Sequence, residues 1–112
     1  VAVRVSALLQ RSRAAGSPCI FVNDNVGRWR SDYPAVLRHC LRPRSRGARI
    51  ARLLQPKPVD YFILKPKHSA FFATTLDTLL RHMEVEELVI TGRTSHQCVL
   101  FTAIDAYVRD LR

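Results

Sequence analysis

The chain has 112 residues, of which 47% are hydrophobic, so it is long enough for one small domain with a packed core. No apolar run approaches the roughly 20 residues that a membrane-spanning helix needs, and no signal or transit sequence is visible. The formal net charge is +9, but the arginines are spread along the chain, and no aromatic residues are interleaved with the densest stretch, residues 42–49. This pattern disfavours a nucleic-acid-binding function and indicates an arginine-rich solvated surface.

Periodic patterns typical of helices alternate with short apolar runs typical of buried strands. In chain order they predict a helix over residues 1–15, a strand over 19–22, helices over 33–41 and 50–54, a strand over 61–64, a helix over 75–83, a strand over 88–90 and a helix from 97 to the end. This alternation predicts an α/β fold, a three-layer Rossmann-like and mostly parallel sheet flanked by helices. Because three strands are few for such a sheet, we expect one partial domain over residues 1–112, incomplete at both ends.

The three cysteines, Cys19, Cys40 and Cys98, are widely separated. Their odd number and the absence of a C-x-x-C pattern argue against a disulfide framework or a zinc site, and indicate a reducing, cytoplasmic setting. Cys98 is the best candidate for chemistry, because it lies in the first turn of the last predicted helix. Unpaired amides and the helix dipole there favour a thiolate and could hold an oxyanion. On spacing alone, a buried structural cysteine is the more frequent case.

Lys65 ends the second predicted strand. Because the carboxyl ends of parallel strands meet at one crevice, we expect Lys65, Cys98 and Asp24 on the same edge of the sheet. A lysine beside a thiolate stabilises it and could deliver a proton to a leaving group. Taken alone, a lysine in a basic protein is usually a solvated surface residue.

Three stretches of the chain carry more specific patterns. Residues 65–71, KPKHSAF, match K-x-R-x-S-A-F with lysine at the arginine position. Residues 92–106, GRTSHQCVLFTAIDA, match G-x-x-T-x-x-C-V followed by T-A-x-D-A, with Ser95 replacing the threonine conservatively. Residues 21–29, FVNDNVGRW, are similar to Y-V-N-D-N-x-G-x-W, with phenylalanine at the tyrosine position. In this order and together, the three stretches resemble the isochorismatase-like family of cysteine hydrolases.

The resemblance implies a role for each matching site residue. Cys98 takes the place of the nucleophile and Lys65 that of the catalytic lysine, while Lys67 stands at the arginine position. The family's non-proline cis peptide maps to Arg93–Thr94, where it would turn the amides of Thr94 and Cys98 toward one oxyanion. The family's third catalytic group is an aspartate at the end of an earlier strand, and no residue of this chain matches it.

Asn23, Asp24 and Trp29 are expected to border the substrate pocket. Asp24 occupies a different strand end from the family's catalytic aspartate, and an Asx turn explains it equally well. Trp29 could form a wall of the pocket or cover a loop. Residues 23–32 contain no histidine, unlike the metal-dependent nicotinamidases of the superfamily, so neither a metal nor another cofactor is expected.

By this resemblance the function is hydrolysis of a small amide-type (C–N) substrate through a thioester on Cys98. We expect a small-molecule substrate, no membrane partner, and the option of a homo-oligomer for the full-length protein. Because the aspartate is missing, the chain itself is expected to be inactive. Two alternatives stay open: a non-catalytic fragment or pseudoenzyme of the same fold and, with less support, a basic nucleic-acid-binding module. The family's strand order further predicts that residues 19–22 pair in parallel with 61–64, and that 88–90 lie beyond 19–22, across the place of a missing strand.

Overall fold

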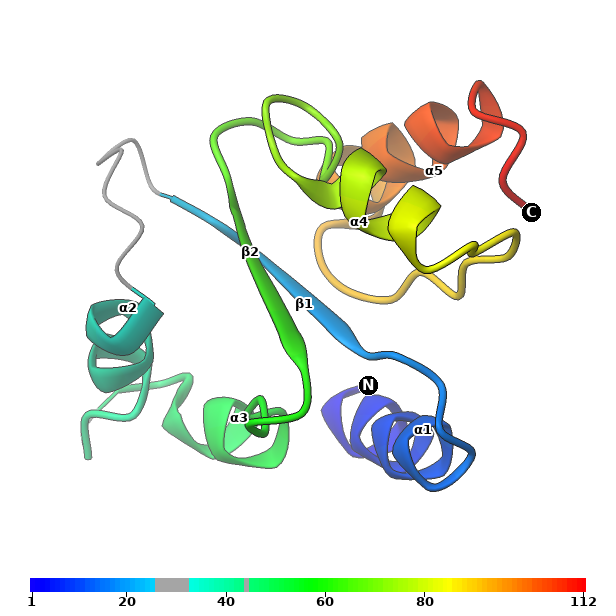
Figure 1. The fold of residues 1–112 in the computed structure, drawn as a ribbon. Coiled ribbons are helices and arrows are strands. Elements are labelled where there is room, and N and C mark those ends of the chain that lie inside the picture. The colour runs from blue at the N-terminus through cyan, green and yellow to red at the C-terminus, as the bar shows by residue number, and fades with distance from the viewer. Residues whose placement is uncertain (26–32, 44) are drawn as a thin grey trace. The chain divides into compact units, whose positions relative to one another are not determined.

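The computed structural model describes residues 1–25, 33–43 and 45–112, which belong to two compact units. The first unit comprises Val1–Phe21 and Ser31–Phe62, and the second comprises Val22–Arg30 and Ile63–Arg112. In chain order the elements are α1 (Ala2–Ala14), β1 (Ile20–Asp24), α2 (Tyr33–Cys40), α3 (Ala48–Leu53), β2 (Tyr61–Lys65), α4 (Leu76–His82), a π-helical turn η1 (Ser95–Val99) and α5 (Leu100–Tyr107) (Figure 1). The alternation of helix and strand predicted from the sequence is therefore confirmed up to α4. None of the helices in the described part of the chain is long and apolar enough to span a bilayer.

β1 and β2 pair with each other and run in parallel. At their beginning the N–H of Tyr61 donates to the carbonyl of Cys19 at 2.9 Å, and at their end the N–H of Asn25 donates to the carbonyl of Lys65 at 2.9 Å. The bonded residues advance in the same direction along both strands, as a parallel ladder requires. The predicted pairing of residues 19–22 with 61–64 is confirmed, and the two strands end side by side at Asp24 and Lys65.

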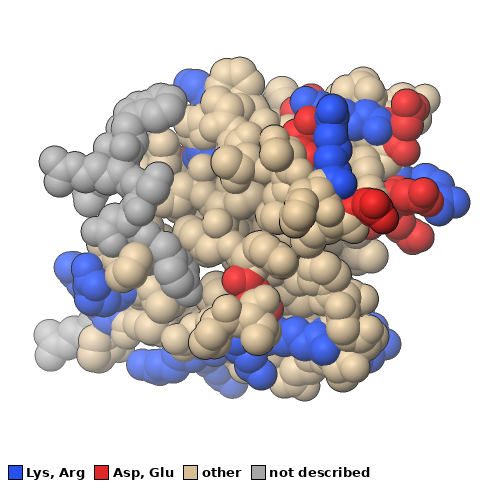
Figure 2. Space-filling view, in the orientation of Figure 1, with Lys and Arg blue, Asp and Glu red and all other residues tan. Residues whose placement is uncertain are grey.

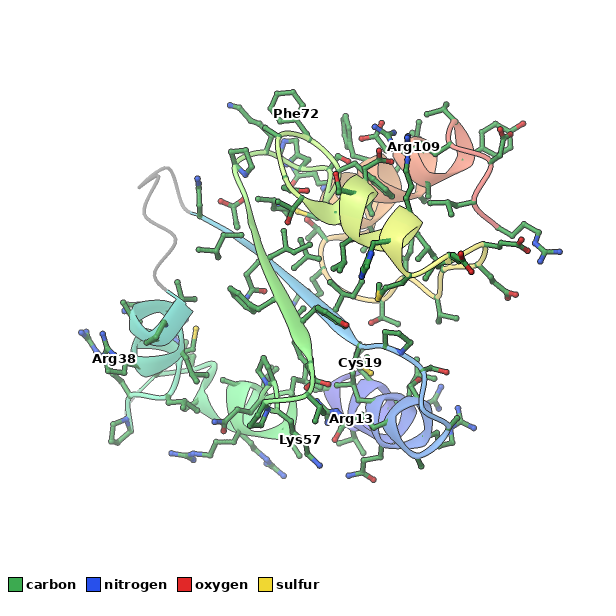
Figure 3. All side chains as sticks on the ribbon, in the orientation of Figure 1. Arg13, Cys19, Arg38, Lys57, Phe72 and Arg109 are labelled. Carbon is green, nitrogen blue, oxygen red and sulfur yellow. The ribbon has the colours of Figure 1, made fainter. Side chains whose placement is uncertain are left out.

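The first unit packs α3 against α1 and against α2. Its best-buried interaction is ionic: the guanidinium of Arg13 on α1 donates through Nε and Nη2 to the two carboxylate oxygens of Asp60, just before β2. The N–H of Lys57 donates to the same carboxylate at 2.6 Å, and the Asp60 side chain is only 1% exposed. Figure 3 shows Arg13 close to Lys57 and Cys19 within this unit. The hydrogen bond from Arg13 holds the pKa of Asp60 below its ordinary value, although burial acts in the opposite direction.

Positive charge belongs mainly to the first unit, in whose sequence Asp32 and Asp60 are the only acidic residues. Figure 2 shows Lys and Arg side chains over α1 to α3 with little acidic surface, whereas both signs are mixed over α4 and α5. Asp60 is thus the counter-charge that α1 depends on. Helical spacing in the sequence predicts that Val1, Val5, Leu8 and Leu9 share the apolar face of the first helix. In the structure Val5, Leu8 and Leu9 are half-buried, whereas Val1 is 91% exposed because it precedes the first helical residue.

The second unit departs from the sequence prediction at residues 88–90, which form no strand. Leu88 donates its N–H to the carbonyl of Arg112, and Arg112 donates its N–H to the carbonyl of Glu86. Val89 is 76% exposed. A strand exists only where a neighbour supplies a backbone ladder, and within the described residues no strand lies beside this segment. The predicted third strand, and with it the predicted order around β1, is therefore not formed.

The last helix is shorter than predicted, because α5 ends at Tyr107. Asp110 has a positive φ of 59°, its N–H donates to the carbonyl of Tyr107, and the N–H of Leu111 donates to that of Ala106. This pair of bonds around a left-handed residue is a Schellman motif, which terminates a helix. The sequence pattern predicts that Val99, Ala103, Ala106 and Tyr107 face inward from the last helix. In the structure Ala106 is buried, but Tyr107 is 79% exposed and Thr102 is buried instead.

We predict that Asp60→Asn lowers the free energy of unfolding by about 3–5 kcal/mol, because it leaves a largely buried guanidinium without its charge partner. Since the pKa of Asp60 is lower in the folded protein than in the unfolded chain, its contribution is complete above the unfolded value of about 3.9 and is lost as the pH falls through the folded value. Urea unfolding followed by circular dichroism at several pH values measures both effects, and D60N should lack this acid-dependent loss.

Glu86→Gln is the matched control, because the Arg112–Glu86 pair is exposed and joins groups 3.7 Å apart. It should cost at most about 1 kcal/mol. Equal effects of the two substitutions would contradict the importance assigned to the buried pair.

Candidate active site

Lys65, the last residue of β2, belongs to the second unit and is only 4% exposed. The Nζ atom lies 3.3 Å from Sγ of Cys98, 2.9 Å from the carbonyl oxygen of Lys67 and 3.4 Å from Oδ2 of Asp24. An ammonium group has three N–H donors, so these contacts use all of them. A positive charge is thereby fixed against the sulfur, where it stabilises a thiolate more than a thiol.

Cys98 lies in η1, immediately before α5, and is half-buried. The peptide bond between Arg93 and Thr94 is cis, at the position that the family resemblance implied. The Thr94 carbonyl accepts from the N–H groups of Gln97 and Val99, at 3.1 and 3.3 Å. Thr94 precedes η1, and among the described hydrogen bonds outside helices and strands none uses its N–H as a donor. This backbone donor is therefore available to an incoming oxyanion.

The three residues expected to border a substrate pocket have different outcomes. Asp24 belongs to the site, because its carboxylate contacts the Lys65 ammonium while its side chain stays 48% exposed. Asn23 precedes it on β1 and is exposed, and among the described residues no contact joins its side chain to Lys65 or Cys98. Trp29 lies outside the described residues. The roles predicted for these residues stay predictions.

Sequence reasoning assigned no role to Asn25, Ser69 or Thr102, all of which are buried in the second unit. Asn25 donates its N–H to the Lys65 carbonyl, and Thr102 accepts the N–H of Ala70. Each belongs to one of the three family-like stretches of sequence. Their place in these stretches is the only feature of the sequence that could have predicted a buried role, because small polar residues ordinarily lie at the surface.

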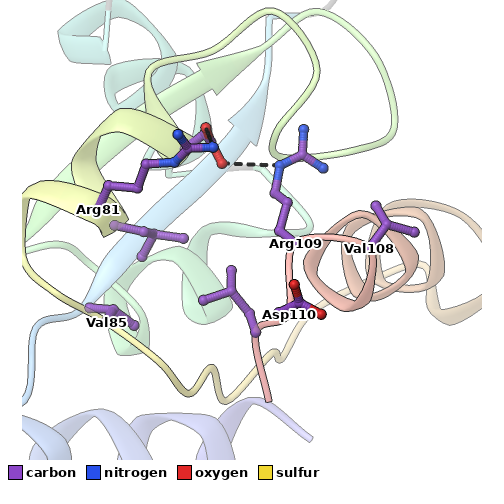
Figure 4. Close-up of a pocket in the computed structure, with 8 residues that line it drawn as sticks. Arg81, Val85, Val108, Arg109 and Asp110 are labelled. Atoms are coloured by element: carbon purple, nitrogen blue, oxygen red, sulfur yellow. Dashed lines mark hydrogen bonds and ion pairs between the residues drawn. The ribbon is translucent and has the colours of Figure 1, made fainter.

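A hollow of about 300 Å³ lies elsewhere in the second unit, between α4 and the end of α5. Figure 4 shows it with Arg81, Val85, Val108, Arg109 and Asp110 on its walls. Its two arginines both pair with Asp77, at 2.9 and 3.0 Å. None of its walls carries a nucleophile, so the chemistry points to Lys65 and Cys98 rather than to this hollow.

The site can be compared with known proteins. The Isochorismatase domain family model matches residues 1–112, and the chain belongs to this family. Over 106 residues it is 41% identical to the isochorismatase family protein YaaI of Bacillus subtilis. This match covers 95% of this chain and 58% of YaaI. It is 44% identical over 54 residues to the ureidoacrylate amidohydrolase RutB of Pantoea ananatis, covering 48% of this chain and 22% of RutB.

Among solved structures, the fold matches N-carbamoylsarcosine amidase from Thermoplasma acidophilum with a TM-score of 0.75 and 26% identity. That match covers 99% of this chain and 64% of the amidase chain. The chain thus spans less than two thirds of each of these three proteins. The likeness confirms an α/β fold of the isochorismatase type.

We predict that iodoacetamide alkylates Cys98 faster than Cys19 or Cys40. Cys19 is buried, and burial raises the pKa of its thiol, an effect that the charge of Asp60 reinforces. Lys65→Met should slow alkylation of Cys98 about tenfold, because the thiolate loses the adjacent positive charge. Labelling time courses resolved by peptide mass spectrometry give the rate at each cysteine.

Lys67→Met is the matched control, since it removes an exposed charge nearby but keeps the backbone carbonyl that Lys65 uses. It should leave the Cys98 rate within about twofold. A Cys98 that reacts no faster than Cys40, or that responds equally to both lysine substitutions, would contradict the assignment.

Proposed function

We propose that the protein is a cysteine hydrolase that cleaves the C–N bond of a small amide-type substrate through a thioester on Cys98. The observation that carries this proposal is the 3.3 Å contact between the buried ammonium of Lys65 and the Cys98 sulfur. A buried cation held against a partly exposed thiol is the arrangement that an activated cysteine nucleophile requires. The family resemblance implies that the N–H groups of Thr94 and Cys98 donate to the oxyanion.

In the proposed reaction, a base removes the thiol proton and the Cys98 sulfur attacks the substrate carbonyl carbon. The new C–S bond forms as the C=O electrons move to oxygen, where the N–H groups of Thr94 and Cys98 donate to the oxyanion. The C–N bond then breaks, and the amine leaves with the proton that the base had accepted. Water, deprotonated by the same base, attacks the thioester, and the departing sulfur regains that proton as the acid is released. Lys65 stays charged beside the sulfur throughout.

We propose that the base is a carboxylate outside residues 1–112. The family resemblance implies an aspartate on an earlier strand, no residue of this chain matches it, and the chain corresponds to 58% of YaaI. Oδ2 of Asp24 lies 3.4 Å from the Lys65 ammonium, which suits it to holding the lysine. The substrate class rests on the likeness to RutB, a ureidoacrylate amidohydrolase, and to the N-carbamoylsarcosine amidase of Thermoplasma acidophilum.

Cys98→Ala in the full-length protein should lower kcat/KM for amide hydrolysis by at least about 10³-fold, because the nucleophile is lost. Cys40→Ser, on α2 of the first unit, should leave it unchanged. Ammonia or amine release from a panel of primary amides, ureido acids and N-carbamoyl amino acids measures turnover, and rapid-quench mass spectrometry detects the acyl group on Cys98. Retained activity in C98A, or an acyl group on another residue, would contradict the mechanism.

The 112-residue chain alone should alkylate rapidly at Cys98 and yet release amine at least about 10²-fold more slowly than the full-length protein, since general-base catalysis contributes 10²–10⁴-fold. Alkylation needs the thiolate but no further proton transfer, so the comparison separates the nucleophile from the base. Equal turnover by both proteins would place the base within residues 1–112. Rapid alkylation without turnover by the full-length protein would favour a non-catalytic member of the family.

A further inference from the structure

The hydroxyl of Thr102, on the first turn of α5, joins the loop that carries Lys65 to the turn that carries Cys98. It accepts the N–H of Ala70 at 3.0 Å and donates to the carbonyl of Cys98 at 2.6 Å. The bond to Cys98 is ordinary back-bonding of a helical threonine to the residue four positions earlier. The bond to Ala70 is not local, because Ala70 belongs to the loop that begins at Lys65. One buried hydroxyl thus connects the loop of the lysine to the turn of the cysteine.

Neighbouring contacts fasten the same loop to α5. Ser69 donates its hydroxyl to the carboxylate of Asp105 and accepts the N–H of Phe71 at 3.1 Å. Arg109 donates to the carbonyl of Asp105 at 2.8 Å, and its guanidinium lies 4.6 Å from the centroid of the Phe71 ring. Ser69 and Ala70 are therefore bound to α5, and Phe71 contacts Arg109 just beyond its end, which leaves the loop little freedom to shift along the helix.

The loop path matters because Lys67, between Lys65 and Ala70, supplies one of the three acceptors of the Lys65 ammonium. A shift at Ala70 moves the Lys67 carbonyl, and a shift at the Cys98 carbonyl moves the sulfur. Thr102 restrains both. We propose that Thr102 is a positioning residue that sets the contact between Lys65 Nζ and Cys98 Sγ. This inference rests on the proposed function and adds to it a residue that acts through the contact between the lysine and the sulfur.

If Thr102 only supports the fold, replacing it lowers the stability of the protein by the same amount with or without Lys65. A positioning role predicts an effect on the Cys98 thiol that requires the lysine. A double-mutant cycle separates the two, because coupled residues give non-additive effects. The readout is the rate of Cys98 alkylation in the full-length protein, which needs no substrate.

Thr102→Val should slow Cys98 alkylation about fivefold, the equivalent of one lost hydrogen bond, and Thr102→Ser, which keeps the hydroxyl, should restore the parent rate. In a Lys65→Met background, T102V should change the rate by less than about twofold. Thr74→Val is the matched control, because the Thr74 hydroxyl binds the Ala70 carbonyl and the Leu76 N–H but not Cys98. It should lower the unfolding midpoint and leave the Cys98 rate within about twofold.

T102V and T102S reacting equally fast would overturn the inference, as would an equal slowing by T102V in the parent and K65M proteins. If T102V does not fold, Thr102→Ala replaces it with the same expectations. A parent Cys98 that reacts no faster than Cys40 would overturn both this inference and the proposed function. A fast parent Cys98 with an unaffected T102V would overturn the inference alone.

Discussion

The buried ammonium of Lys65 is the constraint around which the second unit is arranged. A charge removed from water is tolerated only when it is paired and its hydrogen-bonding capacity is used. The three N–H groups of Lys65 meet acceptors from three separate segments, namely Asp24 at the end of β1, the Lys67 carbonyl in the following loop and the Cys98 sulfur in η1. Displacing any one segment leaves a buried donor unsatisfied, so the position of each depends on the other two.

Buried polar groups therefore help to fix the positions of the segments of the second unit. Lys65, Ser69 and Thr102 are all buried, and among the described residues every fully buried side-chain nitrogen or oxygen has a hydrogen-bond partner. A hydroxyl with both a donor and an acceptor bond cannot rotate without breaking one of them, so a satisfied network specifies one geometry. A nucleophile benefits from that property, since catalysis requires reacting groups to be held in place before the substrate arrives.

The first unit also centres on a buried charge, but with a different chemical consequence. The carboxylate of Asp60 is enclosed by Arg13 and the N–H of Lys57, and the nearby Cys19 is buried with a raised pKa. That arrangement favours a thiol over a thiolate and leaves no approach for a substrate. Cys98 differs in both respects, because its partner is a cation and its side chain is only half-buried. The sign of the adjacent charge and the exposure of the sulfur thus separate a structural cysteine from a reactive one.

The sequence by itself determined the alternation of helix and strand up to α4 and the meeting of Asp24 with Lys65, because residues at the carboxyl ends of neighbouring parallel strands converge whatever the details of packing. The family-like stretches also predicted that Cys98 lies beside Lys65, although no strand leads to Cys98. Only the tertiary structure decided the rest. Residues 88–90 have the composition of a strand, yet a strand needs a neighbour's backbone, which no apolar run can encode in itself. Periodicity likewise gave α5 an apolar face, but the segment that packs on the helix decided its rotation, burying Thr102 and exposing Tyr107. The double hydrogen bond of Thr102 follows from that rotation, since a hydroxyl acquires partners only where two segments meet.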